Sequence, residues 1–166
     1  MGRVRPLIAI CPDPVDRNKE YWLNENYARF VLEEVLPHID SLYGTAAQPA
    51  LRGTLGASLG GLTAVMLAYR HPDVFGVAIS QSGAFQVNNG ALIEEIQKGP
   101  VKPVRFWLDS GTLEGDSRGE PTRQMAAALD ARGYEAIVRY YPEGHSWGNW
   151  RAHVEEALAA FWPFVR

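Results

Sequence analysis

Cysteine is almost absent from this sequence of 166 residues, in which Cys11 is the only one. A single cysteine excludes an intrachain disulfide and a metal cluster held by several thiolates. No run rich in lysine and arginine is present either, and the formal net charge is −3. These absences argue against a nucleic-acid partner, and we expect a functional site without a metal ion or cofactor.

Long apolar runs are also missing. No segment approaches the roughly 18 apolar residues that a membrane-spanning helix needs. The apolar run at residues 7–11 is too short for the core of a signal peptide, and no small-residue cleavage site follows it. We therefore expect a cytoplasmic protein with no membrane partner.

The composition is that of a globular protein. Hydrophobic residues make up 46% of the chain and charged residues 21%, which lies far from the range of disordered proteins. A chain of this length is long enough to bury a sizeable core, and it contains no internal repeat or linker. We expect residues 1–166 to form a single domain.

Five short segments have the apolar character of β-strands, and helical patterns separate them. This alternation predicts an α/β fold with a parallel sheet of about five strands and flanking helices. The last segment alternates apolar and polar residues, as expected of a strand near a sheet edge. The predicted strands are residues 7–11, 53–57, 75–80, 104–108 and 137–141.

Helix boundaries can be predicted from a few residues. Asn24 is a suitable N-cap for a helix that Pro37 should kink or divide. Pro121 is expected to open a later helix, where its missing N–H costs least, and Gly133 to close it. A terminal helix is predicted from Trp150 onward. In folds of this class, functional residues gather in the loops that leave the carboxyl ends of the strands.

The most informative stretch is residues 56–61, with the sequence GASLGG, between a predicted strand and a predicted helix. This is the sequence context of a nucleophile elbow, a sharp turn that would expose the hydroxyl of Ser58. Small residues are needed on both sides because the strand and helix backbones come very close there. The alternative is a glycine-rich turn that binds phosphate or is only structural.

A serine nucleophile needs a base within hydrogen-bonding reach, and the base needs an acidic partner. His145 occupies a loop that follows a predicted strand, whereas His38, His71 and His153 lie in or beside predicted helices. His145 is therefore the candidate base.

The acid is expected between the serine and the histidine in chain order. The predicted loop at residues 109–120 offers Asp109, Glu114 and Asp116. Asp109 adjoins the strand so closely that we interpret it as structural. Spacing alone does not decide between Glu114 and Asp116.

Several stretches together resemble the putative esterase family of α/β hydrolases, which includes enterochelin-type siderophore esterases and feruloyl esterases. Arg17 followed by Tyr21 also matches the segment that precedes the elbow in that family. The resemblance covers nearly the whole chain. The matching stretches are GASLGGL at 56–62, HPDVFG at 71–76, SQSG at 80–83, GHSW at 144–147 with Trp150, and EEVLP at 33–37.

The resemblance implies roles for individual residues. It makes Ser58 the nucleophile and His145 the general base, and its glycine-x-x-acid pattern falls on residues 111–114, which favours Glu114. Two positions depart from the family pattern: Glu143 stands where a glycine is usual, and Ser146 where an aspartate is usual. These departures affect the hydrogen bonding expected around the histidine.

The resemblance also bears on the oxyanion hole, the set of N–H donors that holds the negatively charged reaction intermediate. One donor is expected from the backbone N–H of Leu59. The family has further amino-terminal strands, one of which supplies the second donor, and we expect a shortened α/β-hydrolase-like domain that lacks them. A substitute donor is expected from the amides of Cys11, Asp13 or Val15.

These expectations combine into a serine carboxylesterase that hydrolyses small, short-chain esters through an acyl-enzyme intermediate. Arg17 is expected to orient an acidic or polar substrate, and Phe85 and Trp147 to line its pocket. An open sheet edge favours a homo-oligomer. The alternatives are a non-catalytic or partner-dependent remnant of the fold that acts as an interaction module, and an acyltransferase.

Overall fold

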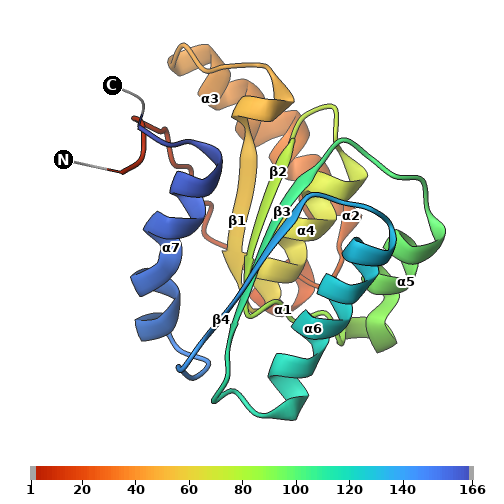
Figure 1. The fold of residues 1–166 in the computed structure, drawn as a ribbon. Helices are drawn as coiled ribbons and strands as arrows, with labels where there is room; N and C mark the ends of the chain where they lie inside the picture. The colour runs from red at the N-terminus through yellow and green to blue at the C-terminus, as the bar shows by residue number, and fades with distance from the viewer. Residues whose placement is uncertain (1–2, 165–166) are drawn as a thin grey trace.

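A parallel sheet forms the centre of the computed structural model, which describes residues 3–164 (Figure 1). The four strands are hydrogen-bonded in the order β1-β2-β3-β4, so that sequence neighbours are also spatial neighbours. The strands are β1 (Gly53–Ala57), β2 (Val77–Gln81), β3 (Arg105–Gly111) and β4 (Ala136–Tyr141). The α/β class predicted from the sequence is confirmed.

Helices connect the strands and cover both faces of the sheet (Figure 1). Within residues 3–164, no helix is both long and apolar enough to cross a membrane. The helices are α1 (Arg17–Glu20), α2 (Glu25–Arg29), the π-helix η1 (Phe30–Val35), α3 (Leu36–Leu42), the 3₁₀ turn η2 (Pro49–Leu51), α4 (Leu59–Arg70), the 3₁₀ turn η3 (Val87–Gly90), α5 (Ala91–Lys98), α6 (Asp116–Ala131) and α7 (Trp147–Phe161).

The core divides into two layers because successive side chains of a strand point to opposite faces of the sheet. Ala78 and Phe106 belong to the larger cluster, which packs against α4, α5 and α6. Val77, Ile79 and Trp107 belong to a smaller cluster with residues of α7. Helix α7 alone covers that second face in Figure 1. Strand β2 is buried along its whole length, because strands flank it on both sides and helices cover both faces of the sheet.

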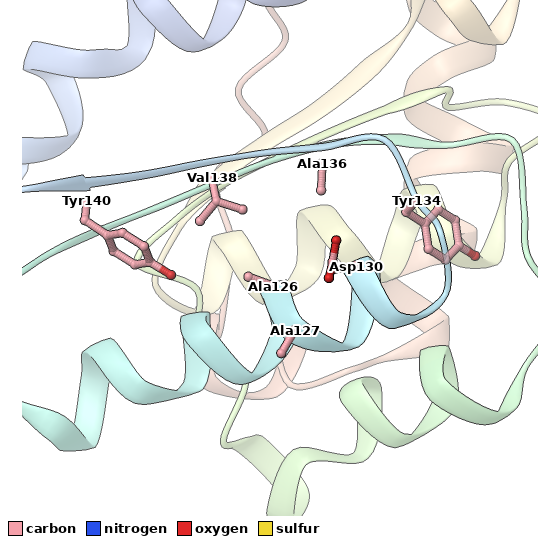
Figure 2. A pocket seen from close by; sticks show the side chains of 7 residues that line it. All are labelled: Ala126, Ala127, Asp130, Tyr134, Ala136, Val138 and Tyr140. Atoms are coloured by element: carbon pink, nitrogen blue, oxygen red, sulfur yellow. The ribbon is translucent and has the colours of Figure 1, made fainter.

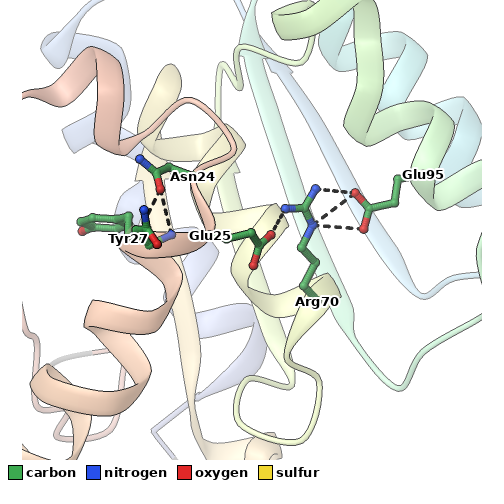
Figure 3. Close-up of polar contacts among 6 residues, drawn as sticks. Asn24, Glu25, Tyr27, Arg70 and Glu95 are labelled. Carbon is green, nitrogen blue, oxygen red and sulfur yellow. Dashed lines mark hydrogen bonds and ion pairs between the residues drawn. The ribbon is translucent and has the colours of Figure 1, made fainter.

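The helix predicted after Asn24 begins as expected. The Asn24 side chain accepts hydrogen bonds from the amides of Asn26 and Tyr27, which makes it the N-cap of α2 (Figure 3). The π-helix η1 then precedes Pro37, which lies in the first turn of α3. Where the sequence predicted a kink or a division of the helix, the chain therefore forms a π-helix, which has wider turns, just before Pro37.

An ion-pair network fastens this first helical segment to the rest of the domain. The guanidinium of Arg70, in α4, lies between the carboxylates of Glu25 in α2 and Glu95 in α5 (Figure 3). Its contact with Glu95 is bidentate, a geometry that suits the planar guanidinium. The pairs hold three helices together on one side of the sheet.

The prediction of a strand at residues 7–11 is wrong, and the sheet has four strands rather than five. The segment is extended but forms no ladder with β1, and Leu7 and Ile8 are 44% and 55% exposed. An apolar run becomes a buried strand only when it finds a partner strand, which a local pattern does not reveal. The nearby regular pairing is a single antiparallel bridge between Val4 and Pro163.

Two boundaries after the third predicted strand also differ from expectation. Strand β3 continues to Gly111, so Asp109 lies inside the strand and not in a loop. Helix α6 begins at Asp116, and Pro121 falls inside it rather than at its start. The connecting loop is therefore only residues 112–115. The terminal helix α7 likewise starts earlier than predicted, at Trp147.

Strand β4 lies at the edge of the sheet, as its alternating pattern predicted. A groove of about 340 Å³ separates it from α6, because small side chains face each other there (Figure 2). None of the residues predicted for the functional site lines this groove. Its lining residues are Ala126, Ala127, Asp130, Tyr134, Ala136, Val138 and Tyr140.

Candidate active site

The turn between β1 and α4 has the backbone geometry of a nucleophile elbow. Ser58 lies between the two elements with φ 57° and ψ −120°, a conformation that side-chain-bearing residues rarely adopt. Two hydrogen bonds fix it: the Ser58 amide donates to the Gln81 carbonyl at 2.9 Å, and the Ala84 amide donates to the Ser58 carbonyl at 3.0 Å. Such strain persists because the surrounding structure holds it in place.

The small residues around Ser58 are required by close backbone contacts. A Cβ atom on Gly56 would lie 2.3 Å from the carbonyl group of Gly60. A Cβ atom on Gly61 would lie 2.5 Å from the hydroxyl of Ser80. At Gly56 any side chain would require a backbone shift, and at Gly61 the Ser80 side chain would have to move. The predicted close approach of strand and helix is confirmed.

His145 and Glu114 form a hydrogen-bonded pair beside this elbow. Nδ1 of His145 lies 2.8 Å from Oε2 of Glu114, whose side chain is completely buried. The other carboxylate oxygen, Oε1, accepts hydrogen bonds from the Gly111 amide at 2.6 Å and from the Ser82 hydroxyl at 2.5 Å. The Glu114 carboxylate is thus the acceptor of all three hydrogen bonds.

These contacts keep Glu114 ionised. Burial by itself would raise the pKa of the Glu114 carboxyl, because it disfavours the charged form. The hydrogen bonds from His145, Ser82 and the Gly111 amide outweigh burial, so the pKa lies below its ordinary value. A charged carboxylate at this position orients the imidazole and stabilises its protonated form.

Backbone contacts between two loops bring Glu114 to His145. The Thr112 amide donates to the Tyr141 carbonyl at 2.7 Å, and the Leu113 amide donates to the Glu143 carbonyl at 3.0 Å. A Cβ atom on Gly111 would lie 2.1 Å from the Glu143 carbonyl oxygen, so this approach requires glycine. The loop that carries the acid is therefore fastened directly to the loop that carries the histidine.

Asp116, the other candidate acid, is placed differently. It is the first residue of α6 and is exposed. Within residues 3–164, the carboxylate bonded to His145 is that of Glu114. Asp109 is fully buried in β3, where it accepts a hydrogen bond from the Trp107 indole at 2.8 Å.

Ser82 and Trp150 complete the surroundings of the pair, and sequence reasoning assigned neither of them a role there. The Trp150 indole N–H donates to the Ser82 hydroxyl at 2.9 Å, and that hydroxyl donates to Glu114. The Trp150 ring also packs against the His145 ring in an edge-to-face arrangement, with centroids 4.9 Å apart. Both residues lie in stretches that carry the family resemblance, which was the available signal.

Ser58 and His145 line one cavity of about 420 Å³. The first residue of α1, Arg17, lines it too, and so does Leu59, at the first position of α4. Backbone N–H groups in the first turn of a helix have no partner within the helix, so the Leu59 amide can donate elsewhere. The full lining is Arg17, Trp22, Ser58, Leu59, Ser82, Gly83, Ala84, Gln86, Val87, Asn88, Asn89, Arg118 and His145.

Four other candidates lie outside this lining. Cys11 and Asp13 are exposed residues of the extended amino-terminal segment. Phe85 is completely buried in the larger core cluster. Trp147 is 75% exposed and packs against Trp150, with ring centroids 5.1 Å apart. The structure therefore brings Ser58, His145 and Glu114 together with Leu59 and Arg17 but leaves these four outside the cavity.

A family model described as "Putative esterase" matches residues 8–161. The chain belongs to this family. This match covers the elbow, both loops of the His145–Glu114 pair and the whole of α7.

Relatives with similar sequences include named esterases. The iron(III) enterobactin esterase of Dickeya dadantii is 27% identical over 170 residues, covering 90% of this chain and 39% of the relative. The endo-1,4-beta-xylanase/feruloyl esterase of Xylanibacter ruminicola is 24% identical, covering 93% of this chain and 21% of the relative. An uncharacterized Bacillus subtilis protein, YbbA, is 28% identical, covering 74% of this chain and 56% of the relative. The chain thus spans about a fifth to just over half of the length of these relatives.

Solved structures support the same fold. The enterobactin esterase of Shigella flexneri superimposes with a TM-score of 0.84 at 24% identity, covering 90% of this chain and 42% of that one. An S-formylglutathione hydrolase from Agrobacterium tumefaciens gives a TM-score of 0.66 at 17% identity, covering 81% of this chain and 57% of that one. Both likenesses support the fold of a parallel sheet with flanking helices.

Proposed function

We propose that this protein is a serine carboxylesterase with Ser58 as nucleophile, His145 as general base and Glu114 as the acid that orients the base. The observation that carries the proposal is the buried 2.8 Å contact between His145 and Glu114 beside the cavity that Ser58 also lines. The elbow geometry of Ser58 supports it, because that turn exposes a hydroxyl at the carboxyl end of a parallel strand.

The proposed reaction has two steps. The Ser58 hydroxyl attacks the ester carbonyl while Nε2 of His145 takes its proton, and the alcohol leaves with that proton from the imidazolium. Water then attacks the acyl-enzyme, again with His145 as base, and releases the acid. Throughout, Nδ1–H of His145 donates to the Glu114 carboxylate, which fixes the tautomer that the reaction needs.

We can assign one of the N–H donors that would stabilise the oxyanion. We place one donor at the backbone N–H of Leu59, which follows the nucleophile and lines the cavity. The sequence suggested the amide of Cys11, Asp13 or Val15 as a substitute for the second donor, but all three residues lie outside the cavity lining. Loss of one donor costs about 2.7–4 kcal/mol of transition-state stabilisation, so we expect a slow esterase.

Small, short-chain esters are the proposed substrates. A cavity of about 420 Å³ has room for one small molecule. Two relatives are named as esterases of enterobactin and of feruloyl groups, which supports ester hydrolysis as the reaction class. We also propose that residues 1–166 act as one domain and that the protein is a homo-oligomer, because β1 leaves an open sheet edge with Leu55 exposed beside it.

The decisive experiment compares Ser58→Ala with the wild type in hydrolysis of 4-nitrophenyl acetate. Removal of the nucleophile should lower kcat by roughly 10³-fold or more, because the covalent route is lost. Ser117→Ala is the matched control, an exposed serine in the first turn of α6 that does not line the cavity. A fluorophosphonate probe should label the wild type at Ser58 and leave Ser58→Ala unlabelled.

Two alternatives have distinct outcomes in the same assays. Hydrolysis by Ser58→Ala at the wild-type rate would overturn Ser58 as the nucleophile. No hydrolysis by the wild type above the buffer rate, together with an unlabelled wild type, would overturn the esterase and favour a non-catalytic interaction module. Diversion of the acyl group to an added alcohol, with less free acid formed, would instead indicate an acyltransferase.

A further inference from the structure

Arginines line the proposed active-site cavity, whereas carboxylates do not. Its lining includes two arginines, Arg17 from α1 and Arg118 from the first turn of α6, and no aspartate or glutamate. Glu114 contacts His145 but is completely buried behind it and does not line the cavity. The whole chain carries 19 acidic residues and a net charge of −3, so a cavity without a carboxylate departs from its average surface.

Both guanidinium groups are available to a ligand. Arg17 and Arg118 are exposed, and neither forms an ion pair within residues 3–164. Arg118 can be compared with Arg123, which lies on the same helix but outside the cavity and pairs with Glu120. Arginines that do form ion pairs with carboxylates are Arg29, Arg52, Arg70, Arg123 and Arg139.

The remaining lining mixes polar with apolar residues and contains no lysine, aspartate or glutamate. The Trp22 indole N–H donates to the Asn88 side chain at 2.9 Å, which ties the segment after α1 to η3 across the cavity. Asn88 and Asn89 both have positive φ, are exposed and line the cavity. Trp22 is 46% exposed and offers an apolar surface. A ligand in the cavity therefore meets two guanidinium groups and no carboxylate of the lining.

Guanidinium groups recognise carboxylates well, because the planar donor fork matches the two oxygens. We propose that Arg17 and Arg118 form an anion-binding subsite, and that the substrates are esters that carry a free carboxylate in addition to the scissile ester. This inference rests on the proposed esterase function and specifies its substrate class. The sequence suggested Arg17 alone; Arg118 and the lack of opposing carboxylates emerge from the structure.

The test uses pairs of esters that differ only in charge. 4-Nitrophenyl glutarate with a free carboxylate is compared with 4-nitrophenyl valerate, which has the same acyl length and a terminal methyl group. A second pair, 4-acetoxyphenylacetate and its methyl ester, places the charge on the alcohol side. The wild type should prefer the charged member of one pair in kcat/KM, and added salt should weaken this preference.

Arg17→Gln and Arg118→Gln should each lower kcat/KM for the preferred charged ester by about five- to tenfold, mainly through KM, because a charge-assisted hydrogen bond is lost. Hydrolysis of the uncharged partner should fall by a smaller factor, so that each variant prefers the charged ester less strongly than the wild type does. Arg123→Gln is the matched control and should leave both esters unaffected, since Arg123 does not line the cavity.

A binding measurement separates failure of the subsite from failure of the esterase. Glutarate should quench the tryptophan fluorescence of Ser58→Ala, and Arg118→Gln in that background should weaken the effect. Equal wild-type rates on both members of both pairs, with no effect of either arginine variant, would overturn the subsite and leave the esterase standing. Glutarate binding that depends on Arg118, in a wild type that hydrolyses no ester, would support the subsite and overturn the esterase.

Discussion

At the scale of single residues, the carboxylate of Glu114 is the most constrained group in the site. It accepts hydrogen bonds from His145, Ser82 and the Gly111 amide while its side chain is completely buried. Removal of such a group leaves its donors without a partner inside the protein, which is costly. The same residue therefore serves both the proposed chemistry and the packing of two loops.

Glu114→Ala is expected to lower kcat by roughly 10²-fold or more, because the imidazole loses the partner that orients it and stabilises its charge. Asp116→Ala should change kcat less than about twofold, since Asp116 is exposed and removed from His145. Ester hydrolysis by the two variants, with circular dichroism to verify folding, checks the difference. A larger loss for Asp116→Ala would transfer the role of the acid to that residue.

At the scale of secondary-structure elements, the length of β3 decides the surroundings of Asp109. The strand continues to Gly111, so this carboxyl is fully buried within it. One oxygen accepts the Trp107 indole N–H, and the other has no hydrogen-bond partner within residues 3–164. Burial raises the pKa of Asp109 to about 6, although the Trp107 hydrogen bond acts in the opposite direction.

The raised pKa predicts a specific pH dependence. Between the unfolded pKa near 3.8 and the folded value of about 6, the folded state binds the extra proton, so stability falls as pH rises through this window. Asp109→Asn keeps an acceptor for Trp107 and removes the buried charge. It should raise the free energy of unfolding by about 1–3 kcal/mol at about pH 8 and leave it nearly unchanged at about pH 4.

Urea unfolding at both pH values measures this difference. Asp130→Asn is the control, because it removes the same charge from an exposed position on α6. The same gain in stability for Asp109→Asn at both pH values would show that the buried charge is not its cause.

At the scale of the whole molecule, the sheet has an open edge at β1. Leu55 on this strand is 45% exposed, and the extended segment at residues 7–11 does not pair with it. Unpaired edges and exposed apolar side chains favour association with another chain. This arrangement is the basis for the proposed homo-oligomer.

Light scattering at micromolar concentration should show a mass above that of one chain, and Leu55→Lys should reduce it by placing a charge on the edge strand. Leu42→Lys is the matched control, because Leu42 is comparably exposed, at 59%, but ends α3. A monomeric wild type would contradict the proposal. An equal loss of mass in both variants would contradict the choice of the β1 edge.

Features that depend on residues close together along the chain could be predicted from the sequence alone. The alternation of strands and helices predicted the α/β class. The glycines around Ser58 predicted the elbow, because the backbones of strand and helix come too close there for a side chain at Gly56. His145 was identifiable because it follows a strand and precedes a helix. Their catalytic roles stay predictions until the variants are measured.

Contacts between residues that lie far apart along the chain became known only from the tertiary structure. Glu114 rather than Asp116 meets His145 because two loops are hydrogen-bonded to each other, and spacing along the chain does not encode that contact. Residues 7–11 form no strand because a strand needs a partner, which an apolar run does not specify. Arg118 lines the same cavity as Ser58 because β3 and the short loop after it bring the first turn of α6 to the carboxyl ends of the strands, so the charge of the cavity is a property of the fold.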